Sequence, residues 1–218
     1  MPALRGSLTY ARFFVSGELP EDFRQRLMRA IRLRAIQPLT PEDEDLERTG
    51  FCRIGDPYAI ELGYDDVFWN EYVNLGVRTD RWVYPGSAVR ARMREGEQVY
   101  KQKTGRDKMG RREKAELKEL VMRRMRKQMS PAVSAIDFSW ALNEGVVRFF
   151  SHGDKAAARM LDLFHRAFGS MSLSLVPEAP YTLADRLGLS KAERSAWDEL
   201  EPSLAEPDVD DREEGEEA

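Results

Sequence analysis

The stretch Val133–Leu142 constrains the fold of this chain more than any other. Its apolar side chains Ile136, Phe138 and Trp140 alternate with polar ones, which is the period of a β-strand that buries one face. After an Asn-Glu-Gly turn, Val146–Phe150 can pair back as the second strand of a hairpin. One face of this antiparallel hairpin should therefore pack on a core.

A helix and another strand are expected after the hairpin. Asp154–Phe168 places apolar side chains at helical spacing, and Met171–Val176 has the composition of a short strand. Together with the hairpin these segments predict a β-β-α-β unit. Two short helical segments should follow, Thr182–Leu187 and Ser190–Leu200.

The first part of the chain predicts a strand, a helix and further strands. Residues 7–16 are rich in β-branched and aromatic side chains, and Pro20-Glu-Asp22 can start a helix that continues to Arg34. An acidic turn or short helix is expected between Pro38 and Gly50. Further strands are expected at 58–63 and 72–83.

Charge is segregated along the chain. Residues 90–127 hold fifteen Lys or Arg and six Asp or Glu, whereas residues 198–218 hold eleven acids and one base. The net charge of −4 therefore does not argue against a polyanionic partner. A basic surface acts locally, within a Debye length of roughly 8 Å in physiological salt.

The basic stretch predicts two helices. One should begin near Ala88 and run to about Tyr100, and the other should span Glu113–Met129, with Gly105 and Gly110 between them. Apolar positions of the second helix form one stripe, and most Lys and Arg lie off it. The pair should form a positively charged projection.

The elements together predict an α+β fold. We expect antiparallel sheet units with packed helices and a projecting basic helical pair. Four portions are expected: a β-α-β portion (1–84), the basic helical projection (85–130), a hairpin, helix and strand core unit (131–187), and a short helix with an acidic disordered tail (188–218).

Composition excludes several protein classes. No apolar run approaches the roughly 20 residues that span a bilayer, and the first residues lack the apolar core of a secretion signal. A soluble, cytoplasmic protein without a membrane partner is expected. Cys52, His152 and His165 do not form a zinc set, and neither a glycine-rich phosphate loop nor a Ser/His/Asp set is recognisable. No cofactor, metal or catalytic residue is therefore expected, and the chain is interpreted as a non-enzyme.

Several short motifs, in order along the chain, resemble the RdgC family of bacterial recombination-associated proteins. The resemblance covers roughly residues 6–187. It depends on the order and spacing of Leu8-Thr-Tyr-Ala-Arg-Phe, Gly50-Phe-Cys-Arg-Ile54, Ala135-Ile-Asp-Phe, Phe164-His-Arg-Ala-Phe-Gly-Ser170 and Pro180-Tyr-Thr-Leu-Ala.

The resemblance implies a nucleoid-associated protein that binds double-stranded DNA with little sequence preference. It also implies a homodimer that forms a ring around the duplex and limits loading of the recombinase RecA. Such binding needs cations that face phosphates. The DNA-binding residues implied by the resemblance are Lys101, Lys103, Arg106, Lys108, Arg111, Arg112, Lys114, Lys118, Arg123, Arg124, Arg126 and Lys127.

Three other interpretations remain open. The first is a protein-interaction adaptor that uses the basic projection to hold an acidic partner. The second is a metal-dependent nuclease, for which Glu116-Leu-Lys118 matches part of a restriction-type motif, although that motif belongs on a strand. The third is a single-strand binder that stacks bases on aromatic side chains otherwise expected in the core: Trp69, Trp82, Tyr84 and Tyr100.

Overall fold

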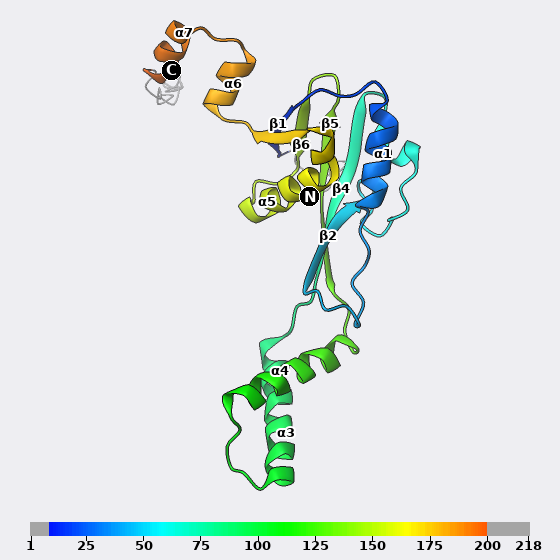
Figure 1. Ribbon diagram of the computed structural model, residues 1–218, viewed down its shortest axis with the longest axis vertical. Helices are drawn as coiled ribbons and strands as arrows, with labels where there is room; N and C mark the ends of the chain where they lie inside the picture. Colours follow the sequence, from blue (N-terminus) through cyan, green and yellow to red (C-terminus); the bar gives the residue numbers. More distant parts are fainter. Residues whose placement is uncertain (1–8, 200–218) are drawn as a thin grey trace, which may run out of the picture. The chain divides into compact units, whose positions relative to one another are not determined.

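The computed structural model describes residues 9–199, and the chain divides into two units, Met1–Glu178 and Ala179–Ala218 (Figure 1). The strands are β1 (Ala11–Ser16), β2 (Glu47–Cys52), β3 (Phe68–Trp69), β4 (Tyr72–Arg81), β5 (Ala132–Ala141), β6 (Val146–Phe149) and β7 (Ser174–Pro177). The helices are α1 (Phe23–Leu33), α2 (Tyr64–Val67), α3 (Gly86–Thr104), α4 (Arg111–Arg126), α5 (Asp154–Phe168), α6 (Pro180–Arg186) and α7 (Lys191–Asp198), with a 3-10 turn η1 (Gly169–Met171). The acidic stretch from residue 200 onward lies outside the described residues.

One antiparallel sheet forms the centre of the first unit. Its strand order is β2-β4-β5-β6-β1-β7, and β3 pairs with part of β4. The longest ladder joins β4 to β5 over ten residue pairs, from Tyr72 opposite Ala141 to Arg81 opposite Ala132. The expected hairpin is present as β5 and β6, and the mixed α and β content with an antiparallel sheet confirms the fold class at this level.

Helices α1 and α5 contact each other and cover one face of this sheet (Figure 1). The alternating apolar residues of the strands point at them, as the two-residue period requires. Ring centroids of Phe51 and Phe168 lie 6.0 Å apart, and those of Phe164 and Phe168 lie 4.7 Å apart. The fully buried side chains at the centre of this core include Leu27, Ile31, Phe51, Leu75, Phe138, Phe164 and Phe168.

The opposite face of the sheet carries a buried ion pair. Arg78 and Asp80 lie two residues apart on β4, so they share a face. Nε and Nη2 of Arg78 donate to the two carboxylate oxygens of Asp80 at 2.6 and 2.7 Å, and the side chains are 5% and 0% exposed. Arg78 Nη1 also donates to the Pro57 carbonyl at 2.9 Å, and the Leu39 amide donates to Asp80 at 3.4 Å. The pair therefore fastens two irregular loops to the sheet.

Gly50 allows the chain to cross close beside β2. After α1, Ala35 forms a parallel bridge with Phe51, and the Ile36 amide donates to the Phe51 carbonyl at 2.8 Å. A Cβ atom on Gly50 would lie 2.6 Å from Ile36 Cα, which is closer than such atoms approach. The crossing covers part of the outer edge of β2, an edge that could otherwise pair with another chain.

Three segments differ from the sequence-based expectations. The prediction of a strand at 58–63 is wrong, because this segment is an irregular loop. Among its residues only Leu62 is buried in the core. Strand β2 begins at Glu47, inside the expected acidic turn, and its charged first residue pairs with Arg159 at 2.7 Å. The strand expected from Met171 begins only at Ser174, since η1 and the left-handed Ser172 come first.

The first and third expected portions of the chain form a single sheet. Strands β1 to β4 come from residues 1–84, and β5 to β7 come from residues 131–187. The division into compact units falls after Glu178 rather than at residue 187. The portion 85–130 is inserted between the paired strands β4 and β5.

The second unit is described as the two short helices α6 and α7. Ser190 caps α7, since its hydroxyl accepts from the Glu193 amide, and the Glu193 carboxylate accepts from the Ser190 amide at 2.7 Å. This capping box satisfies backbone donors at the helix start. Arg194 pairs with Asp185 at 2.5 Å and joins the two helices. Across residues 9–199, none of the helices has the length and apolar character that crossing a bilayer demands.

Candidate nucleic-acid interface

Helices α3 and α4 contact each other and form a pair, here called the arm, that leaves the sheet after β4 and returns to it before β5, and α4 crosses α3 at a steep angle (Figure 1). Both helices were expected, and they span slightly different residues than the pattern indicated. Gly105 ends α3 in a left-handed conformation with φ 66°, which glycine adopts without strain. Residues 105–110 connect α3 to α4.

Few arm side chains are buried. On α3 none is fully buried, and on α4 only Val121 is. The closest approach of the helices is at Gly96, where an added Cβ would lie 2.6 Å from Leu117 Cδ1 and 3.3 Å from Leu117 Cγ. The arm therefore depends on this contact and on polar contacts rather than on a core of its own.

Replacing Gly96 should show how tightly the two helices approach. We expect Gly96→Leu to force them apart and to cost about 1–3 kcal/mol of arm stability, because an overpacked contact cannot relax without moving a helix. Gly96→Ala should be close to neutral, since its gain of about 1 kcal/mol in helix propensity offsets the need to move a flexible leucine. Amide hydrogen exchange across α3 and α4 measures both effects. Equal protection in wild type and Gly96→Leu would contradict this packing.

Glu113 joins the two helices near the tip of the arm. Its carboxylate accepts from the Tyr100 hydroxyl on α3 and from the Gly110 amide at 2.7 Å, and it lies 3.7 Å from Arg106. The Tyr100 hydrogen bond, helped by the Gly110 amide, lowers the pKa of Glu113 below its usual value of 4.5. Glu113 therefore caps the N-terminus of α4 and also links α4 to α3.

The Glu113 contacts should stabilise the arm in a pH-dependent way. A carboxyl whose pKa is lower in the folded state contributes stability above its ordinary pKa and loses it as pH falls through the folded-state value. Glu113→Gln should therefore lower amide protection in residues 100–115 roughly fivefold at neutral pH. The difference from wild type should shrink as pH falls below 4.5, the ordinary Glu value. Glu116→Gln, an exposed acid of the same helix, serves as the control, and a pH-independent difference would contradict the assignment.

Arg126 fixes the base of the arm. Its Nε donates to the Tyr84 hydroxyl at 2.6 Å, and its Nη1 donates to the Asp43 carbonyl, also at 2.6 Å. The guanidinium carbon lies 5.9 Å from the centre of the Trp82 ring, a cation–π distance. Arg126 was among the expected DNA-binding residues, and the structure shows its donors committed within the protein.

The contacts of Arg126 predict a positioning role that depends on guanidinium geometry. Arg126→Lys keeps the charge but replaces two separated donor nitrogens with one, which does not match the positions of both acceptors, so we expect about tenfold faster amide exchange at residues 82–86 and 126–131. Arg124→Lys is the matched control, because no described residue hydrogen-bonds or pairs with the Arg124 side chain. Equal exchange in the two variants would show that the Arg126 contacts do not hold the base.

The twelve expected DNA-binding residues fall into two groups. Four have partners within the protein: Arg106 with Glu113, Arg112 with Glu116, Lys114 with Glu97, and Arg126 as described above. The other eight are exposed and make no side-chain hydrogen bond or ion pair with any residue between 9 and 199: Lys101, Lys103, Lys108, Arg111, Lys118, Arg123, Arg124 and Lys127.

The spacing of the cations along each helix shows which of them lie on the same side of that helix. On α3, Arg90, Arg94 and Lys101 are separated by four and seven residues, so they lie on one side of the helix. On α4, Arg111 and Lys118 are seven residues apart and also share a side.

We infer that the two rows lie on the same side of the arm, because one ion pair joins the helices beside both rows. Glu97 lies three residues after Arg94 and four before Lys101, and its carboxylate is 3.4 Å from Lys114 Nζ. Lys114 in turn lies one turn from Arg111 and from Lys118 on α4. The cationic face, defined as Arg90, Arg94, Lys101, Arg111 and Lys118, therefore runs along both helices on either side of this pair.

Other cations of the arm point elsewhere. At about 100° per residue, Lys103 lies about 160° around α3 from Lys101, and Arg123 lies about 140° around α4 from Lys118. Sequence reasoning placed Arg90 and Arg94 in the basic stretch but left them out of the expected site. Arg90 and Arg94 are four residues apart, and Arg94 is seven residues before Lys101, so all three share one side of the helix. This spacing is the signal that could have added Arg90 and Arg94 to the expected site.

The cationic face has the size of a phosphate-binding surface. Arg90 and Lys101 are eleven residues apart on a helix, which is about 16 Å along its axis. That length matches about five phosphates of one DNA strand, which are spaced 3.4 Å apart along the duplex. Helix axes lie about 8–10 Å apart where two helices pack, so the two rows of cations come closest near the contact of Gly96 with Leu117.

The aromatic candidates for base stacking are mostly engaged within the protein. Trp82 is buried, Tyr84 accepts from Arg126, and Tyr100 donates to Glu113. Trp69 is half-exposed on β3, and its indole nitrogen donates to the Asp65 carbonyl at 3.0 Å. Glu116 is on helix α4, as expected, where it pairs with Arg112 at 3.1 Å. In the described part of the chain, no three or more His, Cys, Asp or Glu side chains gather as a metal site would require.

No protein-family model matches this chain, and no curated protein matches it. The functional assignment therefore depends on the geometry and charge of the arm and on the resemblance of the short sequence motifs.

Proposed function

We propose that the protein binds double-stranded DNA without sequence preference through the cationic face of its arm. The observation that carries the proposal is the set of five exposed cations on one face, none paired to another described side chain. Such cations are free to neutralise phosphates, and each phosphate contact releases condensed counterions from DNA. Binding of this kind is largely independent of base sequence.

The fixed packing of the two helices favours duplex DNA over a flexible single strand. Two rows of cations on a braced helix pair match phosphates that a duplex holds at regular spacing. Single-strand binders instead combine a basic groove with exposed aromatic rings. Three of the four candidate rings are occupied by contacts within the protein, as described above.

We further propose that this binding controls recombination. The RdgC-like motifs support this part, and the same resemblance supports a homodimer, association with the nucleoid and antagonism of RecA. The physical route is competition, because a protein that occupies duplex DNA restricts access of a recombinase to it. Measuring the mass of the protein in solution with and without duplex tests the dimer directly.

Titration with an unrelated duplex tests the proposal against the adaptor alternative. A fluorescent duplex of arbitrary sequence should bind at low salt, and a second duplex of different sequence should bind within about threefold. An acidic protein of similar charge should compete poorly, because its carboxylates lack the regular spacing of phosphates. Absence of duplex binding at low salt, together with capture of the acidic protein, would favour the adaptor and contradict the proposal.

A further inference from the structure

Helix α1 presents a second basic surface, made of arginines alone. Arg24, Arg26, Arg29 and Arg32 lie off its buried side, and the helix contains no lysine. Arg26 pairs with Asp22 at 2.8 Å. By contrast, Arg29 makes no side-chain hydrogen bond or ion pair with any of the residues 9–199.

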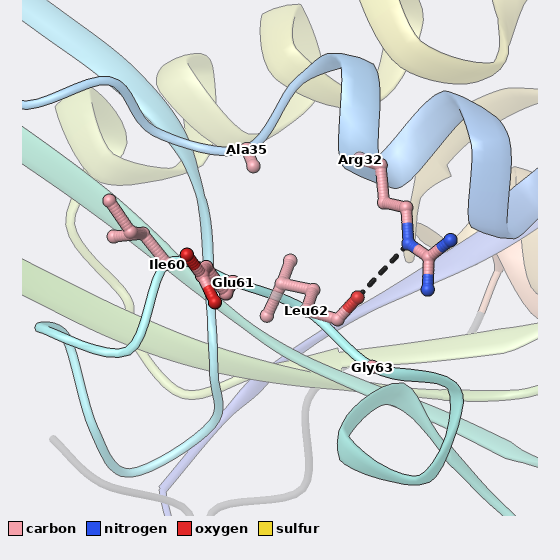
Figure 2. A pocket seen from close by; sticks show the side chains of 6 residues that line it. All are labelled: Arg32, Ala35, Ile60, Glu61, Leu62 and Gly63. Atoms are coloured by element: carbon pink, nitrogen blue, oxygen red, sulfur yellow. Dashed lines mark hydrogen bonds between the residues drawn. The ribbon is translucent and has the colours of Figure 1, made fainter.

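Arg32 keeps most of its donors available. Its Nε donates to the Leu62 carbonyl at 3.1 Å, and Figure 2 shows the two terminal nitrogens on the other side of the guanidinium. A hollow of about 470 Å³ lies beside Arg32 and is also lined by Ala35 and by residues 60–63 (Figure 2). The free end of the exposed Arg32 side chain points away from these lining residues, where an oxygen ligand can approach it from solvent.

Two more hollows flank α1, and Arg29 lines both. One, of about 580 Å³, lies between α1 and η1 and includes Leu33 and Met171. The other, of about 390 Å³, lies toward α2 and includes Met28 and Tyr64. Leu33 is 75% exposed and Tyr64 is 45% exposed, so large apolar surfaces lie beside the unpaired guanidinium.

Tyr64 and Arg24 are held rigidly. The Tyr64 ring stacks on Phe68 with centroids 4.7 Å apart, and its hydroxyl accepts from Arg24 Nη1 at 3.0 Å. Arg24 also donates to the Asn70 carbonyl at 2.9 Å and lies over the Phe23 and Phe68 rings. Groups fixed before binding lose little conformational entropy when a partner arrives. Tyr, Met and Arg are also the side chains enriched in protein interfaces.

We propose that this surface, centred on Arg29 with Arg32, Leu33 and Tyr64, binds an acidic peptide segment of a partner protein. Carboxylates of the segment accept from Arg29 and Arg32, which lie one helical turn apart, and an apolar side chain between them fills a flanking hollow. Charge complementarity selects the acidic partner. The apolar hollows favour a peptide over nucleic acid, because a phosphate backbone has no apolar side chain to place there.

The test uses a synthetic peptide probe and the full chain. The probe is a fluorescent helix of about 15 residues with glutamates one turn apart and leucines between them, and the control peptide has glutamine at each glutamate position. Saturable binding of the probe at about 0.15 M salt is expected, with the control peptide at least tenfold weaker. Arg29→Gln should weaken probe binding about tenfold and Leu33→Ser about threefold. Arg94→Gln on the arm, the same change in charge, should alter it less than twofold.

Three results would overturn the proposal. The first is the absence of saturable probe binding. The second is an equal loss of probe binding in Arg94→Gln and Arg29→Gln, which would place the peptide on the arm or make the attraction non-specific. The third is a loss of duplex DNA binding in Arg29→Gln as large as that in Arg94→Gln, which would make the α1 surface a nucleic-acid contact. Circular dichroism of each variant confirms that it is folded, and the exposed positions of Arg29 and Leu33 make that the expected outcome.

Discussion

Reversing two charges on the cationic face, with Arg94→Glu and Lys118→Glu together, is expected to weaken duplex binding about a hundredfold at 0.15 M salt. Each lost phosphate contact forfeits counterion release worth about fivefold at that salt, and the introduced carboxylates add repulsion. Both side chains are exposed, so the fold should tolerate the change. Fluorescence anisotropy with a labelled duplex measures the loss.

The matched control carries the same change in charge on other sides of the arm. Lys103→Glu with Arg123→Glu also reverses two unpaired cations, one on each helix. We expect it to weaken binding less than tenfold, through long-range attraction alone. If the two double variants lose affinity equally, the arm attracts DNA by total charge, and the cationic face has no special role.

The largest expected effect on stability comes from the buried ion pair on the sheet. Asp80→Asn should destabilise the fold by about 3–5 kcal/mol, because it leaves the Arg78 guanidinium buried without a compensating charge. It also weakens the acceptor that holds the Leu39 amide, so the loop after α1 should loosen. Urea unfolding measures the change in free energy, and proteolysis in that loop reports the local effect.

An exposed ion pair provides the control for this prediction. Asp162→Asn removes an acid that lies 2.8 Å from Arg166 on α5, with side chains 63% and 42% exposed. Surface pairs of this kind contribute about 0–1 kcal/mol. If Asp80→Asn lowered the free energy of unfolding as little as Asp162→Asn does, the buried pair with Arg78 would not be a main source of stability.

Elements with a strong apolar period were predictable from the sequence. The hairpin of β5 and β6 has clear alternation, and α5 has a wide apolar side that ends at Phe168, so both were found with nearly correct bounds. The arm helices were found because glycines separate two helical patterns. In each of these cases local pattern and tertiary packing agree.

Elements defined by tertiary contacts were not predictable. Strand β2 starts with Glu47 and Arg48, whose side chains pair with Arg159 and with Asp43 and Asp45, so its beginning resembles a polar turn. The loop at 58–63 has apolar residues without a strand, because side chains hold the backbone at its two ends: Arg78 donates to the carbonyl of the preceding Pro57, and Asp66 accepts from the Gly63 amide. A buried pair such as Arg78 with Asp80 leaves no periodic signal in the sequence.

The same limit applies to the candidate site. The sequence indicated that residues 90–127 are basic, and twelve cations were named within them. It could not show that Arg126 is committed to Tyr84 and Asp43, residues more than forty positions away. Glu97 joins the two cationic rows through Lys114, and this contact depends on how the helices pack. The packing also decides on which side of the arm Arg90 and Arg94 lie.

The salt dependence of duplex binding tests the central claim most directly. For wild type, the logarithm of the binding constant should fall linearly with the logarithm of salt concentration, with a slope of about −0.9 per phosphate contacted. Neutralising Arg94 and Lys118 to Gln should reduce the steepness of that slope by about 2, and neutralising Lys103 and Arg123 should leave it nearly unchanged. A wild-type slope near zero, or equal slopes in all three proteins, would contradict the assignment of the cationic face as the DNA-binding surface.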